Sequence, residues 1–511
     1  MKLSYLINTI PIKNINGSNI NNLSMIGDIE ISSIHYNSKE VLPGSLFVAI
    51  PGFKSDGHNF IDDAVSRGAA AVLVQKPVKN NAVVIEVENT RKMLGIISAQ
   101  FYDNPSQHIV LIGITGTNGK TTTSFLIEQI LAAAGFNIGV IGTIDYHYMG
   151  KSFKNPVTTP ESLDLQKIFF EMKKNGVTHV IMEASSHGID LHRLEGCHFD
   201  IGVFTNLTQD HLDYHKNMES YWLSKQRLFT EYIDLKSKKK HKAAVLNCNN
   251  PKARELLKNL EIPCITTGYS AENMLYSKDF QFGTDGITGN ISILGSNFDF
   301  KSFLIGEYNL ENILCAAGVG AALDLDSDII KAGIESLTSV PGRIESVPNT
   351  KGRFVYVDYA HTPDALENVL STLKSLASGK LICVFGCGGN RDKSKRAQMG
   401  KIAASFSDCA IVTSDNPRNE EPLAIINEIL PGVKKACSRE YFGSEILSGL
   451  NGKGYFIEPD RKRAINLAIK ISHSGDIVLI AGKGHETYQI IGKETLSFDD
   501  KKQAQKALKS I

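Results

Sequence analysis

The chain has 511 residues, of which 42% are hydrophobic and 21% are charged, and its formal net charge is +1. This length exceeds one ordinary hydrophobic core and predicts about three domains, while the balanced charge gives no hint of nucleic acid or an anionic membrane as partner. Because the chain has neither an apolar run of about 18 residues nor the apolar core of a signal peptide at its start, we expect a cytoplasmic protein without membrane insertion.

The first part of the chain, residues 1–107, predicts a smaller α/β domain. Short apolar runs indicate strands at Gly44–Ile50, Ala70–Val74 and Ala82–Val87, and a helical pattern covers Asn59–Ser66. The turn cluster Asp103-Asn-Pro-Ser106 follows and is a plausible linker.

A glycine-rich loop comes next, between the predicted strand Ile109–Ile112 and the predicted helix Ser124–Ala134. Its sequence is Gly113-Ile-Thr-Gly-Thr-Asn-Gly-Lys-Thr-Thr122, which departs from the general phosphate-loop pattern at Ile114. Such a loop points backbone N–H groups and a helix N-terminus at an anion, while the lysine supplies charge and the threonine a hydroxyl for Mg²⁺. We therefore predict an ATP or GTP site rather than a purely structural turn, with contacts from Gly116, Thr117, Asn118, Gly119, Lys120, Thr121 and Thr122.

Strands and helices then alternate, as a parallel α/β sheet requires. The predicted strands are Asn137–Gly142, Thr178–Glu183, Ile201–Asn206 and Ala243–Asn247, and short alternating strands between Phe280 and Leu304 indicate an antiparallel flap. Two predicted helices lead to Val340-Pro-Gly-Arg-Ile344, a second candidate linker, so this region predicts a domain over residues 108–340.

Two polar clusters follow strands of this sheet. Glu183 ends one strand, and Asp210, His211 and His215 follow the next. Because ligands of open sheets lie beyond the carboxyl ends of the strands, we expect both clusters to face the nucleotide and to ligate a divalent metal; the alternative is that the histidines only cap a loop. Lys225 lies in the helical stretch Tyr221–Phe229 and by composition is an ordinary solvated lysine.

The last part, residues 341–511, again alternates, with predicted strands at Phe354–Asp358, Leu381–Phe385, Ala410–Thr413 and Ile477–Ala481. Cys383 and Cys387 lie around one strand end at a spacing that suits neither a zinc ribbon nor a redox pair, so we expect reduced, partly buried cysteines.

Charged residues follow three of these strands. Arg391 and Arg418 could bind a carboxylate, while Asp415 and Glu486 could hold an ammonium, which together suit a zwitterionic ligand. The alternative is a network of surface salt bridges.

These motifs, in this order, resemble the Mur ligases. The resemblance covers about Ser38 to Glu486 and is carried by the phosphate loop, Glu183-Ala-Ser-Ser-His-Gly188, Thr205-Asn-Leu-Thr-Gln-Asp-His-Leu-Asp213, Gly306-Glu-Tyr-Asn-Leu-Glu-Asn312, Pro341-Gly-Arg343, Asp358-Tyr-Ala-His-Thr-Pro363, Asp415-Asn-Pro-Arg418 and Gly482-Lys-Gly-His-Glu486. It implies an α/β fold of three domains: a smaller N-terminal UDP-binding domain, a central P-loop ATPase with a mostly parallel sheet, and a C-terminal Rossmann-like domain for an amino acid.

The resemblance also implies the roles of individual residues. Those expected at the uridine diphosphate are Tyr36, Ser38, Phe53, Lys54 and Ser55, and those at the muramoyl dipeptide are Thr158, Thr159, Ser185 and Arg193. Near the adenine and phosphates it implies Asn309, Asn312 and Arg343, and for the amino acid Arg391, Asp415, Asn416, Pro417, Arg418, Gly482 and Glu486. Catalysis would rest on Lys120, Glu183, His211 and Lys225, and Mg²⁺ on Thr121, Glu183, His211 and a carbamylated Lys225. Leu191 stands where some members have a glutamine that contacts the muramoyl substrate.

The implied activity is ATP-dependent addition of meso-2,6-diaminopimelate to UDP-N-acetylmuramoyl-L-alanyl-D-glutamate, through an acyl phosphate, in peptidoglycan precursor synthesis. Arg418 favours diaminopimelate over lysine because lysine has no distal carboxylate to pair with it. The alternatives are a lysine-adding Mur ligase and a folylpolyglutamate synthase-like ligase. A nucleotide switch is disfavoured because no Asn-Lys-x-Asp guanine signature occurs, and we expect a monomer.

Overall fold

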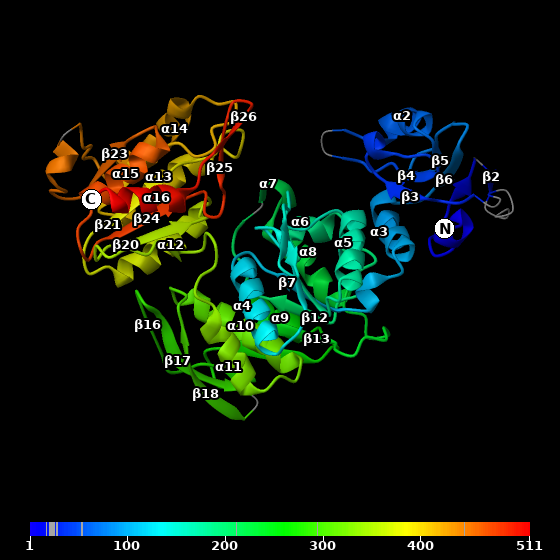
Figure 1. Cartoon of the computed structure of the whole chain (residues 1–511), viewed down its shortest axis with the longest axis horizontal. Coiled ribbons are helices and arrows are strands. Elements are labelled where there is room, and N and C mark those ends of the chain that lie inside the picture. Colours follow the sequence, from blue (N-terminus) through cyan, green and yellow to red (C-terminus); the bar gives the residue numbers. More distant parts are fainter. Residues whose placement is uncertain are drawn as a thin grey trace. The chain divides into compact units, whose positions relative to one another are not determined.

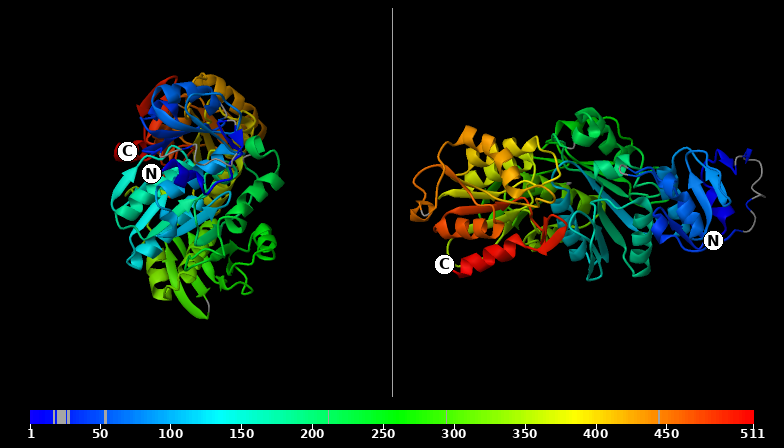
Figure 2. Two further views of the ribbon diagram at one scale, coloured as in Figure 1. Left: turned by 90° about the vertical axis from the view of Figure 1, so that its right-hand side faces the viewer. Right: turned by 90° about the horizontal axis from the view of Figure 1, so that it is seen from above.

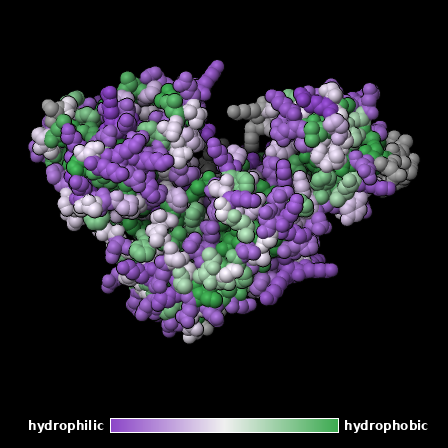
Figure 3. Space-filling model, in the orientation of Figure 1, coloured by the Kyte–Doolittle hydropathy of each residue, from purple (hydrophilic) through white to green (hydrophobic). Residues whose placement is uncertain are grey.

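The computed structural model describes residues 1–16, 18, 19, 26, 29–52, 55–210, 212–293, 295–443 and 445–511. The predicted site residues Phe53, Lys54 and His211 lie outside this set. The chain forms two compact units, the first comprising Met1–Tyr276, Ile293–Ser296 and Leu314–Gly333, and the second Ser277–Ser292, Asn297–Ile313 and Ile334–Ile511. Figure 3 shows hydrophilic side chains over much of the visible face of each part. None of the described helices is long and apolar enough to cross a membrane.

The first unit begins with a six-stranded sheet (Figure 1). Its apolar side chains alternate between two cores. One core packs against α1 (Leu3–Ile7) and α3 (Thr90–Phe101), and the other against α2 (Ile61–Ser66). The strand order is β2 (Ser18–Asn19), β1 (Asn14–Ile15), β6 (Val83–Glu86), β5 (Ala69–Val74), β4 (Ser45–Val48) and β3 (Ser33–His35), with β3 to β6 parallel. Short 3₁₀ turns at Ser38–Glu40, Gly57–Phe60 and Pro105–Gln107 connect these elements.

A second sheet of the same unit carries the predicted phosphate loop at the carboxyl end of one of its strands. Its strands run in the order β10 (Lys151–Phe153), β9 (Tyr146–Tyr148), β8 (Ile138–Ile141), β11 (His179–Glu183), β7 (Val110–Thr115), β12 (Ile201–Phe204), β13 (Ala243–Asn247), β14 (Cys264–Gly268) and β15 (Leu275–Tyr276). All but β9 and β10 are parallel to their neighbours. Glu183 pairs with Ile114 and Phe204 with Thr115, so the polar segments after these strands begin at one edge.

Helices of this region connect the strands. They are α4 (Lys120–Ala133), α5 (Ser162–Lys174), α6 (Ser186–Asp190), α7 (Leu212–His215), α8 (Met218–Thr230) and α9 (Pro251–Leu257), while α10 (Tyr308–Ala322) and α11 (Ser327–Ser336) contribute residues to both units. The antiparallel flap is confirmed: β16 (Phe280–Gly283) pairs with β17 (Gly286–Ile293), which also pairs with β18 (Ser296–Ser302).

The second unit contains a doubly wound sheet with a helix layer on each face (Figure 2). Its order is β19 (Glu345–Ser346), β20 (Phe354–Asp358), β24 (Ile477–Ala481), β21 (Leu381–Phe385), β22 (Cys409–Val412) and β23 (Gly454–Ile457), all parallel except β19. Alternate side chains face α12 (Pro363–Leu376), α13 (Lys395–Phe406) and α14 (Pro422–Ala436) on one side, and α15 (Arg461–Ile471) and α16 (Asp500–Lys509) on the other. A 3₁₀ turn at Glu445–Ser448 and a hairpin of β25 (Tyr488–Ile491) and β26 (Glu494–Ser497) complete the unit.

The eight cysteines are all free, and seven of them are buried.

Candidate active site

The phosphate loop follows β7 and leads into α4, as predicted. Gly119 has a left-handed φ of +87°, and a Cβ on Gly116 would lie 1.9 Å from Thr205 Oγ1, so both positions require glycine. Residues that follow β12 hold the loop in place. Asn206 Oδ1 accepts a hydrogen bond from Asn118 N at 2.9 Å, and Thr205 Oγ1 donates one to Asn118 O at 2.6 Å. The loop is therefore a preformed turn at a helix N-terminus, the geometry that suits a phosphate.

Lys120 begins α4 and folds back over this loop. Its Nζ donates to Gly116 O and to Thr117 O, each at 2.8 Å. The ammonium thus lies above the backbone that would hold a phosphate, which is the place where a point charge assists nucleotide binding.

Glu183 ends β11 within reach of the first turn of α4. Its side chain is 1% exposed, and Thr121 Oγ1 donates to Oε1 at 3.0 Å. Thr143, which sequence reasoning missed, donates its backbone N to Oε1 at 3.0 Å and its Oγ1 to Oε2 at 2.9 Å. Thr121 and Glu183 together present the hard oxygen atoms that Mg²⁺ prefers beside a phosphate, so these described residues fit that ion.

No larger metal cluster is present in the described residues, which omit His211: no three histidine, cysteine or acidic side chains gather there as a ligand set. His215 is buried, and its ring lies 5.1 Å from that of Tyr221 and 5.5 Å from that of His187.

Lys225 lies in α8 and is not the solvated lysine that its composition indicated. Its side chain is 1% exposed, its Nζ donates to Gly116 O at 2.8 Å, and it lies 4.3 Å from the centre of the Tyr221 ring. Burial lowers the pKa of this amine well below its usual value, the positive charge of Lys120 lowers it further, and Asp210 opposes the shift. The expectation was wrong because α8 packs this face against the phosphate loop, which a helical pattern alone does not reveal.

The buried Lys225 amine should destabilise the fold near neutral pH. The pKa of this amine is lower in the folded chain than in the unfolded chain, so at neutral pH the unfolded chain binds more protons. The free energy of unfolding is therefore reduced at neutral pH, and it rises as the pH approaches the unfolded pKa of about 10.4. We expect Lys225→Met to raise the melting temperature by about 2–4 °C at neutral pH in CO₂-free buffer, because Gly116 O keeps its hydrogen bond from Lys120. The difference should shrink toward alkaline pH, and a lower melting temperature for the variant at neutral pH would contradict this reading.

The four residues predicted for the muramoyl dipeptide gather around the end of β11. Thr159 Oγ1 donates to Glu183 O at 2.8 Å and lies 3.0 Å from Ser185 Oγ. Arg193 Nη1 donates to Thr159 O at 2.8 Å, and Thr158 Oγ1 lies 3.1 Å from Thr143 Oγ1. This cluster is continuous with Glu183. Leu191 is the C-cap of α6 and half-buried.

The described residues of the predicted UDP site lie in the N-terminal sheet region. Tyr36 OH donates to Asp164 Oδ2 at 2.7 Å and so contacts the start of α5, Ser38 is buried in a 3₁₀ turn, and Ser55 is exposed.

A second group of predicted residues lies beyond strands of the C-terminal sheet. Arg418 Nη1 donates to Gly389 O at 2.8 Å, which joins the loops after β22 and β21, and a Cβ on Gly389 would lie 1.8 Å from Pro417 O. Asn416 Nδ2 donates to Glu486 Oε2 at 2.8 Å, and a Cβ on Gly482 would lie 2.9 Å from Asp415 Oδ2. The three loops therefore form one site.

The four charged residues predicted here differ in their ion pairs. Arg391 is exposed and Arg418 half-buried, and neither pairs with a carboxylate of the described residues, whereas Asp415 and Glu486 both pair with Lys483. Asp415 is 6% exposed, and its Oδ1 accepts no hydrogen bond from the described residues. Lys483, which sequence reasoning left without a role although it lies in the Gly482–Glu486 motif, is fully buried beside Asp415 and Glu486.

The residues predicted near the adenine belong to the second unit, whereas the phosphate loop belongs to the first. Asn312 Nδ2 donates to Asn309 Oδ1 and Asn309 Nδ2 to Ile305 O, each at 2.8 Å, and both side chains are buried. The Arg343 guanidinium lies 5.1 Å from the centre of the Tyr359 ring.

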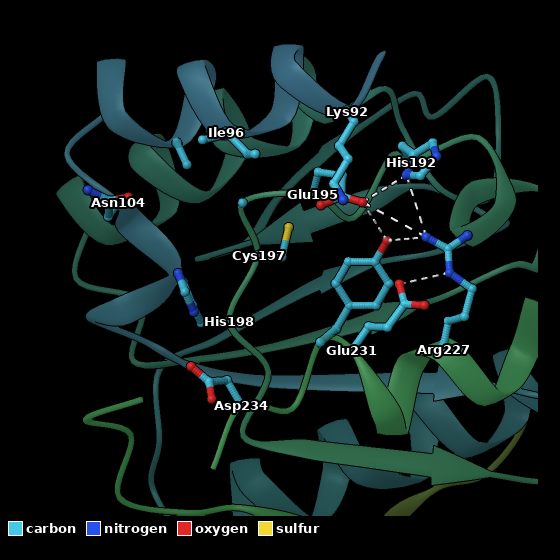
Figure 4. A pocket seen from close by; sticks show the side chains of 13 residues that line it. Lys92, Ile96, Asn104, His192, Glu195, Cys197, His198, Arg227, Glu231 and Asp234 are labelled. Carbon is cyan, nitrogen blue, oxygen red and sulfur yellow. Dashed lines mark hydrogen bonds and ion pairs between the residues drawn. The ribbon is translucent and has the colours of Figure 1, made fainter. Parts of the chain in front are cut away.

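A cavity of about 790 Å³ lies in the first unit away from these groups (Figure 4). It is lined by α3 and by residues around Glu195 and Arg227, which share hydrogen bonds with Tyr232. None of the described site residues predicted from the sequence lines it.

Comparison with known proteins connects this geometry to one family. The model of the Mur ligase family, catalytic domain, matches residues 30–102, that of the Mur ligase middle domain 114–320, and that of the Mur ligase, glutamate ligase domain, 342–484. The UDP-N-acetylmuramoyl-L-alanyl-D-glutamate–2,6-diaminopimelate ligase of Geobacter metallireducens is 45% identical over 94% of this chain and 95% of that protein.

Solved structures of Mur ligases also match this chain. A structure of an enzyme with that same name is 31% identical, with a TM-score of 0.67 over 94% of this chain and 95% of its own. The MurF ligase from Thermotoga maritima in complex with ADP shares the fold, with 20% identity and a TM-score of 0.61 over 94% of this chain and 98% of its own. Because three Mur ligase family models match successive segments of the chain and a ligase of known name is 45% identical over 94% of it, the chain belongs to the Mur ligase family.

Proposed function

We propose that this protein is an ATP-dependent ligase that joins meso-2,6-diaminopimelate to UDP-N-acetylmuramoyl-L-alanyl-D-glutamate in peptidoglycan precursor synthesis. The observation that carries the proposal is that Gly116 O accepts hydrogen bonds from both Lys120 and Lys225 while Glu183 contacts Thr121. A phosphate loop, a buried carboxylate and a buried amine thus meet at one sheet edge. The names of relatives at 40–45% identity support the choice of substrates.

Three domains would divide this work: residues 1–107 for the UDP end, 108–340 for ATP and the reaction, and 341–511 for the amino acid. The extents of the three family matches support these boundaries. Tyr36, Ser38 and Ser55, with Phe53 and Lys54 outside the described residues, would bind the UDP end. The cluster of Thr158, Thr159, Ser185 and Arg193 would hold the dipeptide with its terminal carboxylate toward Glu183.

The loop residues 116–122 would bind the triphosphate through backbone N–H groups, with Lys120 at the terminal phosphates. Asn309, Asn312 and Arg343 would complete the nucleotide site. A carboxylate oxygen of the D-glutamate then attacks the γ-phosphorus, the bond to the β-phosphate oxygen breaks, and ADP leaves. The amine of the amino acid attacks the resulting acyl phosphate at carbon, phosphate departs with its bonding electron pair, and the nitrogen loses a proton to form the amide.

Mg²⁺ would offset the charge between the carboxylate and the triphosphate, held by Thr121, Glu183, His211 and a carbamylated Lys225. The structure supports Lys225 in this role because carbamylation needs a neutral amine, and burial favours that form. The uncharged Lys225 nitrogen would attack CO₂ and lose one proton, which converts a neutral amine into an anionic oxygen ligand.

Diaminopimelate specificity would rest on Arg418, helped by Arg391, at the distal carboxylate. Asp415 and Glu486 would receive the distal ammonium, with Asn416, Pro417 and Gly482 shaping the site. An unpaired Arg418 guanidinium would cost lysine about 1–3 kcal/mol or more.

An acceptor assay tests the proposal. The enzyme is incubated with ATP, Mg²⁺ and UDP-N-acetylmuramoyl-L-alanyl-D-glutamate, together with meso-diaminopimelate, lysine or no acceptor, and phosphate and product mass are measured. We expect the ligated product and rapid phosphate release with diaminopimelate only. Equal use of lysine would reject the proposed specificity for diaminopimelate. Phosphate release that depends on neither the UDP-dipeptide nor the amino acid would reject the ligase activity.

A further inference from the structure

Lys483 is a buried cation that the proposed reaction does not yet use. It follows β24, its side chain is 0% exposed, and its Nζ donates to Glu486 Oε2 at 2.9 Å and to Asn416 Oδ1 at 3.1 Å. The same Nζ lies 3.7 Å from Asp415 Oδ1. It therefore sits among the two carboxylates and the amide of the amino-acid site.

Lys483 and its neighbours occupy only some of the oxygen atoms in this cluster. Glu486 Oε2 accepts from both Lys483 Nζ and Asn416 Nδ2, whereas Glu486 Oε1 accepts no hydrogen bond from the described chain. Asp415 Oδ1 is buried and likewise accepts none from it. Each carboxylate thus keeps one oxygen available for a further donor.

The backbone around the cluster is also held in place. Asn416 Oδ1 accepts from Ile490 N at 2.9 Å as well as from Lys483, and Gln489 Nε2 donates to Asp415 O at 2.7 Å. Hydrogen bonds from strand β25 therefore hold Asp415 and Asn416 in place, and Lys483 connects Glu486 to Asn416.

Within this cluster of described residues the two carboxylates of Asp415 and Glu486 have one cationic partner, Lys483. Arg391 and Arg418 belong to the same site but form no ion pair with either carboxylate in the described chain, so a ligand ammonium can pair with the two carboxylates. Without Lys483, two carboxylates facing one partly buried space would repel each other. The half-buried Glu486 would then turn toward solvent.

We propose that Lys483 is a positioning residue that holds Asp415 and Glu486 side by side, and so adapts the site to an amino acid bearing one distal ammonium. This inference rests on the proposed function. It predicts that Lys483 acts on the choice of amino acid rather than on the nucleotide or the dipeptide.

The test compares meso-diaminopimelate with 2-aminopimelate, which keeps both carboxylates and lacks the distal amine. The wild-type enzyme should prefer diaminopimelate by at least about 10²-fold in kcat/KM. Lys483→Met should lower kcat/KM for diaminopimelate enough to reduce this preference to about 3-fold or less, while the KM values for ATP and the UDP-dipeptide change by less than about 2-fold. Lys483→Gln serves if the methionine variant does not fold.

Lys239→Met is the matched control, because Lys239 is also buried and ion-paired, with Asp200 at 2.5 Å, and belongs to the other unit. It should lower the melting temperature and leave the preference unchanged. A folded, neutral Lys483 variant with the wild-type preference would overturn the inference while leaving the ligase proposal intact. A wild-type enzyme that used neither amino acid would instead overturn the proposed function.

Discussion

Lys225→Ala is expected to lower the rate of ATP-dependent ligation by about 10²–10³-fold. Added formate or acetate is expected to raise the rate of this variant by about tenfold or more. The side chain lies against the phosphate loop with no carboxylate partner among the described residues, so as a plain amine it would supply no anionic oxygen where a metal ligand is needed. The alanine variant leaves a space in which a small carboxylate can supply the missing oxygen atoms. Phosphate release in the presence of all substrates gives the rates.

Lys239→Ala is the control for this experiment. Lys239 is a buried lysine of the same unit, but its ammonium contacts Asp200 rather than the phosphate loop, so formate should not change the activity of that variant. Full activity of Lys225→Ala would contradict the assigned role. A loss that no carboxylate reverses would contradict the carbamate.

Arg418→Met should reduce kcat/KM for diaminopimelate by about 10²–10³-fold and should not lower kcat/KM for lysine. Hydrogen bonds hold the arginine in place, from its own N to Ile490 O at 3.1 Å and from Nη1 to Gly389 O at 2.8 Å. Its φ of +54° shows that the loop keeps a conformation that is uncommon for arginine, which is consistent with a functional constraint. Methionine keeps much of the side-chain length and removes the charge.

Arg439→Met serves as the matched control for Arg418→Met. Arg439 lies in the same unit, but its side chain is 41% exposed and pairs with Glu445. Its replacement should therefore leave kcat/KM unchanged for both diaminopimelate and lysine. If Arg418→Met keeps the wild-type ratio of the two acceptors, another group must recognise the distal carboxylate.

The sequence predicted the strands well where they are buried on both faces. Phe354–Asp358, Leu381–Phe385, Ala243–Asn247 and Ile477–Ala481 were predicted with the bounds that the structure has, because a continuous apolar run between polar turns leaves little choice. The strand Gly454–Ile457, helix α3 and the β25–β26 hairpin were missed. The hairpin strands are short and largely exposed, so they lack an apolar signal.

The site was harder to predict where burial decides the chemistry. The phosphate loop carries its own pattern, and the placement of Glu183 follows from the register of β11 with β7. By contrast, Lys225 and Lys483 look like surface lysines in the sequence, and only the packing of α8 and β25 gives them buried surroundings. Thr143 was missed for the same reason, since its contacts with Glu183 depend on the neighbouring strand β8.

The most direct test of the whole account follows an oxygen atom from the carboxylate to the phosphate. UDP-N-acetylmuramoyl-L-alanyl-D-glutamate labelled with ¹⁸O in the terminal carboxylate is ligated to meso-diaminopimelate, and the released phosphate is analysed by mass spectrometry. Attack of the carboxylate on the γ-phosphorus predicts one ¹⁸O atom in each phosphate. Phosphate without ¹⁸O would show that the loop delivers the γ-phosphate to water, and would contradict the proposed ligase mechanism.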